Sequence, residues 1–186
     1  DLYFSDGTPL RAEDFVYSWQ RLADPKTAAY TFVIDHLVNA EAIFAGKLAP
    51  ATLGVKALSE YVLEVKLATP DPAFLAKCTT LFTTAVPRHT IEQYGESWST
   101  PQHLVSTGAY KLSDRVVNGP ISAKKNPYFY QAKQVAITNL IFTPYVDRNA
   151  ALAAYKSGSV DISGDVPVDQ YQSLIKQYPA ELHTVK

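Results

Sequence analysis

Apolar residues recur at helical spacing near the start of the chain. Phe15, Trp19 and Leu22 lie three or four positions apart, and polar residues occupy most positions between them. Acidic residues in the first turn favour a helix here, because they interact well with the positive end of its dipole. The pattern predicts a helix over 12–23. Pro25 should end it, since the residue before a proline avoids the helical conformation.

A strict alternation of apolar and polar residues follows further along the chain. Leu63, Val65 and Leu67 would share one face of a strand over 61–67, and a second strand is expected over 55–58. The two strands predict a β-hairpin whose turn lies at residues 59 and 60, neither of which is a favoured hairpin-turn residue.

The remaining pattern predicts short helices first and alternating strands and helices later. Asp147 should cap one helix, Gly158 should end it, and Pro167 should begin the next. The first half is therefore expected to be a helical cluster with a hairpin, and the fold class α/β (mixed α+β). Further helices are expected over 30–44 (in two pieces), 74–80, 89–94, 148–157 and 167–177, and strands over 109–112, 121–124, 135–144 (more buried), 160–162 and 182–186.

Composition excludes several classes of function. The chain has 186 residues, 47% of them hydrophobic, so a real core can form, while its net charge of -1 gives no basic surface for nucleic acid or anionic membranes. No apolar run approaches the ~20 residues that cross a bilayer. The 12 tyrosines and near-neutral charge suit a polar and aromatic binding cleft.

Candidate catalytic and metal-binding residues do not form recognisable motifs. The four histidines lack the spacing of a metal site, and the single cysteine, Cys78, lies in an apolar stretch that favours an inert thiol. No nucleophile elbow or phosphate-binding glycine loop is present. We therefore expect no catalytic residue, no metal site and no cofactor. From composition and spacing alone, the purpose of this α/β chain stays open.

Both ends of the chain resemble strands. The sequence contains no methionine, residues 1–4 read as the end of one strand, and the last five residues read as another. We therefore expect an internal piece of a longer protein. Apolar surface that other parts would cover should then be exposed, and the piece should tend to self-associate.

The stretch 4–21 carries a specific resemblance. Its sequence FSDGTPLRAEDFVYSWQR is similar to the signature of the oligopeptide-binding family of solute-binding proteins, with Phe4 in place of the usual tryptophan. Shorter matches follow in the family's order across the whole chain. They include 53–57, 70–74, 85–87, 94–98, 107–110 and 157–161.

The resemblance implies part of a two-lobed periplasmic binding-protein fold. Residues 1–87 would belong to a smaller accessory domain, and 88–186 to part of the first lobe, with the second lobe beyond residue 186. In this family the lobes close on an extended peptide, whose main chain is held like an added strand while its side chains enter hydrated pockets.

Three ligand-facing residues are implied by the same resemblance. Tyr30 matches a tyrosine that faces the peptide, although a tyrosine packed in a helix is an equal alternative. Gly164 and Asp165 match a ligand-facing loop where relatives often have asparagine. The groups that anchor the peptide termini would lie mostly in the second lobe.

The resemblance predicts a peptide-binding receptor subunit of an ATP-driven oligopeptide importer. Its partners would be the peptide and the importer's membrane permease, without nucleic acid, and its location would be the periplasm or a lipid anchor outside the cytoplasmic membrane. Two alternatives remain open: the same fold with another ligand (a dipeptide, a murein peptide, nickel or haem), and a ligand-sensing domain of a regulator. An enzyme is the least favoured alternative.

Overall fold

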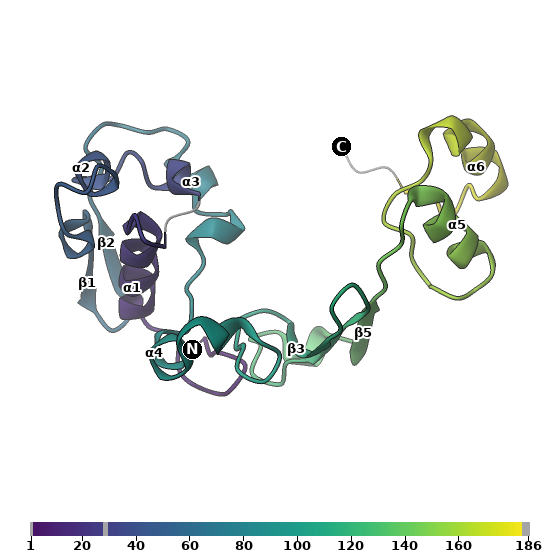
Figure 1. Cartoon of the computed structure of the whole chain (residues 1–186), viewed down its shortest axis with the longest axis horizontal. Helices are drawn as coiled ribbons and strands as arrows, with labels where there is room; N and C mark the ends of the chain where they lie inside the picture. The colour runs from purple at the N-terminus through teal and green to yellow at the C-terminus, as the bar shows by residue number, and fades with distance from the viewer. Residues whose placement is uncertain (1, 28–29, 184–186) are drawn as a thin grey trace. The chain divides into compact units, whose positions relative to one another are not determined.

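The computed structural model describes residues 2–27 and 30–183. Its contacts divide the chain into two compact units, one comprising Asp1–Arg115 with Ile121–Ile141, the other Val116–Pro120 with Phe142–Lys186 (Figure 1). Helices and strands are mixed, which confirms the predicted fold class. The predicted domain boundary at residue 87 concerns the family's domains rather than these contact units, and stays a prediction.

The first helix, α1 (Ala12–Ala23), has the predicted bounds. Its buried face includes Val16, Trp19 and Ala23. Arg11 precedes the helix in an extended conformation, and its backbone N–H donates to the carboxylate of Asp14 at 2.8 Å. This bond satisfies one polar group at the start of the helix, although Arg11 itself is a poor capping residue.

The predicted hairpin pairs β1 (Val55–Ser59) with β2 (Val62–Val65) in antiparallel register. Its turn lies at Glu60 and Tyr61, one residue later than predicted, which leaves Tyr61 exposed. The reason is an irregularity between Ala57 and Ser59, where β1 takes up an extra residue.

One hydrophobic core joins α1 to the hairpin and to the segment between them. Trp19, Ile34, Leu37 and Ile43 are buried together in it, and Leu63 of β2 packs against its edge. Figure 1 shows α1 beside the hairpin. The segment between them contains the 3-10 helix η1 (Thr31–Val33) and α2 (Ala40–Phe44), so the prediction of two short helical pieces over 30–44 is confirmed.

Short helices connect this core to the sheet. Helix α3 (Phe74–Lys77) is shorter than predicted, because the hydroxyls of Thr79 and Thr80 bond to helix carbonyls 2.7–2.8 Å away at its end. The other connecting helices are η3 (Leu81–Thr83), α4 (Arg88–Tyr94) and η4 (Gly95–Ser99), whereas η2 (Pro50–Thr52) lies between α2 and β1.

A three-stranded sheet has the order β3–β4–β5. A turn that contains Asn118 joins β3 (Tyr110–Arg115) to β4 (Ile121–Lys125), and Asn118 has the positive φ of 57° that such turns use. After η5 (Ala132–Gln134), β5 (Asn139–Phe142) forms the edge. The prediction of a longer, more buried strand over 135–144 is wrong, because no described element covers the exposed side chains of this edge strand.

The second unit is built on two helices. Asp147 caps α5 (Arg148–Lys156) by accepting from the Ala150 N–H at 2.8 Å, and Gly158 follows with a φ of 74°, both as predicted. The 3-10 helix η6 (Val168–Gln170) then leads into α6 (Tyr171–Gln177). The strand predicted over 160–162 is absent from the described chain, since no described strand pairs with it. Residues 182–183 are not strand, and 184–186 lie outside the described residues.

No helix among the described residues is long and apolar enough to span a membrane.

Candidate functional site

Tyr30 lies at the centre of an exposed group of aromatic rings. Its ring stacks on Phe82 with centroids 4.1 Å apart, and Phe32 meets the edge of the same Phe82 ring at 6.0 Å. The three side chains keep 53%, 39% and 54% of their surface exposed, in the order Tyr30, Phe82 and Phe32. The alternative of a tyrosine packed inside a helix is therefore wrong, because Tyr30 precedes η1 and is half-exposed.

Buried neighbours hold these rings in place. Val33 and Ile34, which follow Phe32, are fully buried in the core. On the other side, the carbonyl of buried Thr83 accepts a hydrogen bond from the Trp19 indole N–H at 2.9 Å, next to Phe82. Both segments that carry the rings are therefore attached to the core of the first unit.

The predicted loop residues Gly164 and Asp165 lie in the second unit. The space around the Gly164 Cα is open, with nothing within 4 Å of where a side chain would begin. Asp165 is exposed, and its carboxylate lies 3.5 Å from the guanidinium of Arg148 at the start of α5. The hydroxyl of Ser163 donates to the Asp165 carbonyl at 3.1 Å. The loop thus presents open backbone and one solvated ion pair.

A cavity of about 460 Å³ lies beside this loop within the second unit. Its lining is mostly apolar and includes both buried leucines of the helices, Leu152 and Leu174, together with Ile162 and Ser163 of the loop. Tyr155 also lines it and donates to the carboxylate of Glu181, which raises the pKa of the tyrosine. The hollow is large enough for a side chain or small ligand group.

The stretch that carries the family resemblance is structural. Phe4 and Ser5 are buried, and the Ser5 N–H donates to the Ser106 carbonyl at 2.7 Å. Gly7 has a φ of 90°, and the Tyr128 ring lies where a side chain at Gly7 would begin, 3.0 Å away. The turn therefore favours glycine for its conformation, and a side chain at this position would also displace the Tyr128 ring. It joins the start of the chain to the segments around β3 and β4.

The same turn holds a histidine–carboxylate pair. The imidazole Nε2 of His89 lies 2.7 Å from Asp6, and its ring also meets the edge of Phe4. Burial acts to raise the pKa of Asp6, but hydrogen bonds from the Thr8 N–H and His89 outweigh it, so that the pKa is lowered. This pair orients the turn within the first unit.

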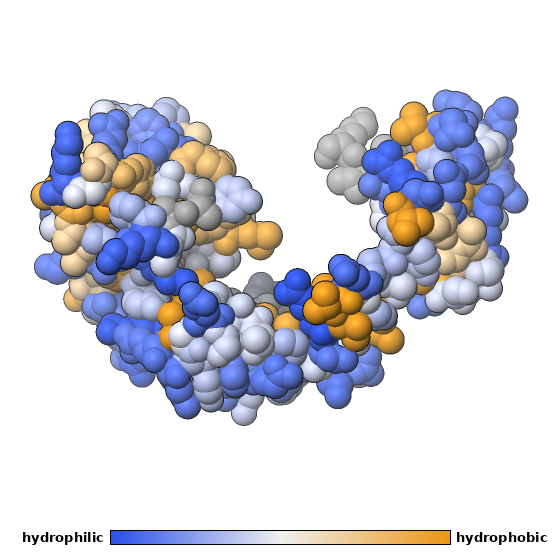
Figure 2. All heavy atoms as spheres, viewed as in Figure 1, coloured by the Kyte–Doolittle hydropathy of each residue, from blue (hydrophilic) through white to orange (hydrophobic). Residues whose placement is uncertain are grey.

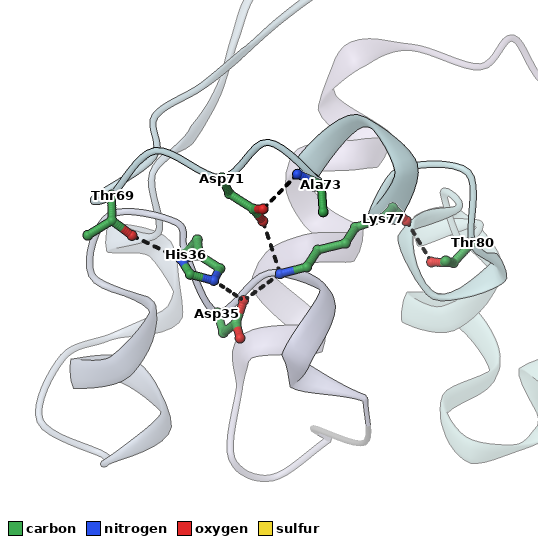
Figure 3. A network of polar contacts seen from close by, with 7 residues as sticks. All are labelled: Asp35, His36, Thr69, Asp71, Ala73, Lys77 and Thr80. Atoms are coloured by element: carbon green, nitrogen blue, oxygen red, sulfur yellow. Dashed lines mark hydrogen bonds and ion pairs between the residues drawn. The ribbon is translucent and has the colours of Figure 1, made fainter.

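A second polar network surrounds Lys77 (Figure 3). The ammonium of Lys77 lies 3.0 Å from Asp71 and 3.1 Å from Asp35. His36 lies 2.9 Å from the Thr69 hydroxyl and 3.7 Å from Asp35. The close Lys77 ammonium lowers the pKa of Asp71, and the Asp71 carboxylate raises that of Lys77. The network connects the loop after β2 to the core segment around residue 35.

We expect Lys77→Met to lower stability at neutral pH and to lose this effect in acid. The lowered pKa of Asp71 contributes stability at pH values above its ordinary pKa of 3.8, and the contribution disappears as pH falls through the folded pKa. Urea unfolding of wild type and variant at pH 7 and pH 3 measures the difference. A gap of equal size at both pH values would contradict the role of the ion pair.

Lys66→Met is the matched control. Lys66 lies on the surface, and its ammonium is 3.5 Å from the carboxylate of Glu64, two residues earlier in the chain. Exposed pairs of this kind contribute little. The control should therefore leave stability unchanged at both pH values.

The cysteine and the other histidines show no catalytic arrangement. Burial raises the pKa of the Cys78 thiol, which keeps it protonated and weakly reactive, beside a 240 Å³ cavity that Phe15, Thr107 and Tyr130 help to line. His103 stacks on Tyr94 at 3.7 Å. Within residues 2–27 and 30–183, no three His, Cys, Asp or Glu side chains gather closely enough to hold a metal ion.

The structure adds two residues that sequence reasoning missed. Phe32 and Phe82 complete the aromatic group with Tyr30, which lies in the first unit, whereas Gly164 and Asp165 lie in the second. No motif marks Phe82, since its contact with Tyr30 spans 52 positions of sequence and depends on the core between them.

Comparison with known protein families gives one match over nearly the whole chain. Residues 1–184 match the middle region of the bacterial extracellular solute-binding proteins, family 5. The chain belongs to this family. The resemblance seen in stretch 4–21 is thereby confirmed.

Curated relatives of this family 5 protein include several binding proteins. It is 38% identical over 183 residues to the periplasmic oligopeptide-binding protein OppA of Salmonella typhimurium, covering 96% of this chain and 34% of OppA. It is 40% identical over 189 residues to the probable deoxycholate-binding periplasmic protein YgiS of Escherichia coli, covering 99% and 35%. The chain thus spans about a third of the length of these relatives.

Solved structures of the family have the same fold. OppA of Burkholderia pseudomallei superposes with a TM-score of 0.90 at 35% identity, over 95% of this chain and 35% of that one. OppA of Haemophilus influenzae, in complex with the peptide RPPGFSPFR, gives 0.90 at 32% identity over 97% and 36%. The predicted periplasmic binding-protein fold is therefore confirmed for the part that this chain spans.

Proposed function

We propose that this family 5 chain is part of the peptide-binding receptor of an ATP-driven oligopeptide importer. The observation that carries the proposal is the family match over residues 1–184, together with 38% identity to an oligopeptide-binding protein. A relative solved with a bound nine-residue peptide supports the ligand class. The chain's part in this function is binding and delivery without chemistry, in keeping with relatives that are receptors.

The proposal includes a partner and a location. The receptor hands its peptide to the membrane permease of the importer, and it works in the periplasm or on a lipid anchor outside the cytoplasmic membrane. The support is that the relatives include oligopeptide-binding proteins named as periplasmic.

We assign residues 1–87 to a smaller accessory domain and 88–186 to part of the first lobe of the receptor. Tyr30, Gly164 and Asp165 are the proposed ligand-facing residues. Their exposure supports this role: Tyr30 offers a ring face, and Gly164 offers open backbone that a peptide strand could approach. Asp165 adds a negative charge that would favour a basic side chain or amino terminus over a carboxylate.

Isothermal titration of the full-length protein with tri- to pentapeptides tests the proposal. We expect saturable binding of several peptides with different side chains, because main-chain hydrogen bonds are common to all peptides. The absence of binding heat and of any thermal stabilisation with every peptide would overturn it.

A second candidate keeps the receptor role and changes the ligand. The specific observation is 40% identity to a probable deoxycholate-binding protein, with 35% identity to a murein peptide-binding protein also present. Mass spectrometry of the ligand that purifies with the native protein discriminates among oligopeptide, murein peptide, bile salt and metal cofactor. Recovery of a bile salt without peptide would favour the second candidate.

The 186-residue chain by itself is expected to self-associate. Hydrophobic side chains lie on the surface of both compact units (Figure 2). Exposed patches of this kind drive association. Sedimentation velocity should show concentration-dependent oligomers and dye binding, and a stable monomer without dye binding would contradict the expectation. The most exposed of these residues include Leu81, Val117, Val146, Ile162 and Val168.

A further inference from the structure

The segment between residues 97 and 146 is basic, although the chain as a whole is nearly neutral. It contains five lysine and arginine residues and a single acidic residue, Asp114. The rest of the chain has 12 basic and 17 acidic residues, so the segment has an excess of positive charge and the remainder an excess of negative charge. The basic residues lie in β3, in β4 or in η5, and they are Lys111, Arg115, Lys124, Lys125 and Lys133.

Two of these lysines lie directly opposite each other in the sheet. The antiparallel register of β3 and β4 pairs Lys111 with Lys124. The side chains of such a pair share one face, with Cβ atoms about 4.5–5.5 Å apart, and two like charges there destabilise the sheet. The arrangement therefore costs stability unless a negative group lies against both ammonium groups.

No carboxylate in the described part of the chain supplies that negative group. Within residues 2–27 and 30–183, neither Lys111 nor Lys124 forms an ion pair. Asp114 is exposed, and its carboxylate accepts from the N–H of the adjacent Arg115 at 2.8 Å. The positive charge of the two lysines is therefore left for a group outside this part of the chain.

The opposite face of the same two strands is already occupied. Tyr110 and Lys125 form the neighbouring pair in the register, so their side chains project from the other face. The hydroxyl of Tyr110 and the ammonium of Lys125 donate to carbonyls of the segment 135–137, at 3.1 and 2.7 Å. These bonds hold that segment against the sheet. On the face of the opposed lysines, Lys124 is exposed and Lys111 half-buried.

This face suits the carboxylates of a protein better than a membrane surface. Anionic membranes recruit proteins through clusters of about four to eight basic residues. The face presents two opposed lysines, and the acidic remainder of the chain would be repelled by a negatively charged lipid surface. Two ammonium groups held at a fixed spacing instead match one or two carboxylates of an acidic segment.

We infer that Lys111 and Lys124 form a docking surface for an acidic segment of a partner protein. The carboxylates of that segment lie between the two ammonium groups and remove the repulsion between them. The inference goes beyond the proposed peptide binding and does not depend on it. It also gives a reason why the sheet contains a like-charged pair, since departures from local stability rules are expected at functional sites.

Binding of an acidic probe to the full-length protein tests the docking surface. The probe is a fluorescent oligoglutamate with blocked termini, and its anisotropy is measured with and without excess trialanine. We expect saturable binding that trialanine does not displace, and that weakens as NaCl rises from about 20 mM to about 200 mM, because salt screens exposed charges. Absence of binding at low salt would overturn the inference. Displacement by trialanine would also overturn it, since the probe would then occupy the peptide site.

Paired substitutions locate the binding on the sheet. Lys111→Gln with Lys124→Gln should weaken oligoglutamate binding by about threefold to tenfold, as expected for the loss of two exposed charge contacts. Lys26→Gln with Lys47→Gln is the matched control, because it removes the same charge from two exposed lysines outside the sheet. Its binding should stay within about twofold of wild type. Equal losses in the two double variants would overturn the assignment to this face.

Two further measurements separate docking from a structural role and from lipid binding. At low salt, the double variant at Lys111 and Lys124 should unfold at a slightly higher temperature than wild type, because it lacks the repulsion between like charges. A lower unfolding temperature would show that the lysines serve folding, and would overturn the docking role. Co-sedimentation with vesicles of phosphatidylglycerol and phosphatidylcholine is the second measurement. Vesicle binding that needs both lysines, without binding of oligoglutamate, would overturn the protein partner in favour of lipid.

Discussion

Trp19→Ala should destabilise the core of the first unit by about 3–5 kcal/mol, as large-to-small substitutions of buried aromatic residues do. Trp19 is buried in the core and meets the edge of Phe74 with ring centroids 6.3 Å apart. Its indole N–H also donates to the Thr83 carbonyl at 2.9 Å, so truncation leaves a cavity and an unpaired buried carbonyl.

Amide hydrogen exchange of the full-length protein measures this effect locally. Peptides that cover α1 and the β1–β2 hairpin should lose protection together, because they share the core. Trp19→Phe helps to separate the two contributions, since it removes the hydrogen bond and keeps most of the ring volume. We expect it to cost about 1–3 kcal/mol.

Trp98→Ala is the matched control, at the only other tryptophan of the chain. Trp98 lies in η4 and is half-buried. Its truncation should leave the exchange of α1 unchanged. If Trp19→Ala altered exchange no more than Trp98→Ala did, the central role of Trp19 in the core would be wrong.

Asn126→Ala should destabilise the region around β3 and β4 by about 2–4 kcal/mol, because it leaves two polar backbone groups without partners. Asn126 is fully buried at the end of β4. Its amide donates to the Gly108 carbonyl at 2.8 Å, and its side-chain oxygen accepts from the Tyr128 N–H at 3.0 Å. The Tyr128 ring in turn lies against Gly7, so the effect should reach the first turn of the chain.

Asn139→Ala provides the comparison. Asn139 is exposed on β5, and among the described residues its side chain bonds only to the adjacent Thr138 hydroxyl, at 3.1 Å. Surface substitutions of this kind usually change stability by less than about 0.5 kcal/mol. Equilibrium urea unfolding and exchange of peptides from β3 and β4 should separate the two variants. Equal stability of Asn126→Ala and Asn139→Ala would show that the buried hydrogen bonds contribute nothing.

Local sequence patterns predicted correctly those elements whose ends are set by residues close together in the sequence. The bounds of α1 follow from its apolar spacing and from Pro25, and α5 follows from the Asp147 cap and Gly158. The β3–β4 turn at Asn118 was likewise predictable from its own residues. These features are local because capping, turn geometry and side-chain periodicity act over short distances.

The strand predictions were wrong where hydrogen bonding to a neighbouring strand determines whether a strand forms. The stretch 160–162 has a suitable composition but no described strand beside it, and β5 is shorter and more exposed than its apolar residues suggested. A strand depends on hydrogen bonds to a neighbour that the local sequence does not specify. For the same reason, an irregularity in β1 moved the hairpin turn by one residue.

The sequence by itself determined the family and the mixed fold, because stretch 4–21 forms a turn beside buried Phe4 and Ser5 in which Gly7 has a φ of 90° that favours glycine. Only the tertiary structure decided what surrounds Tyr30. Phe82 lies 52 positions away and reaches it because the Trp19–Thr83 hydrogen bond and the buried residues after Phe32 hold both segments on one core. Contacts between distant segments depend on the packing of the whole core, and no local pattern encodes them.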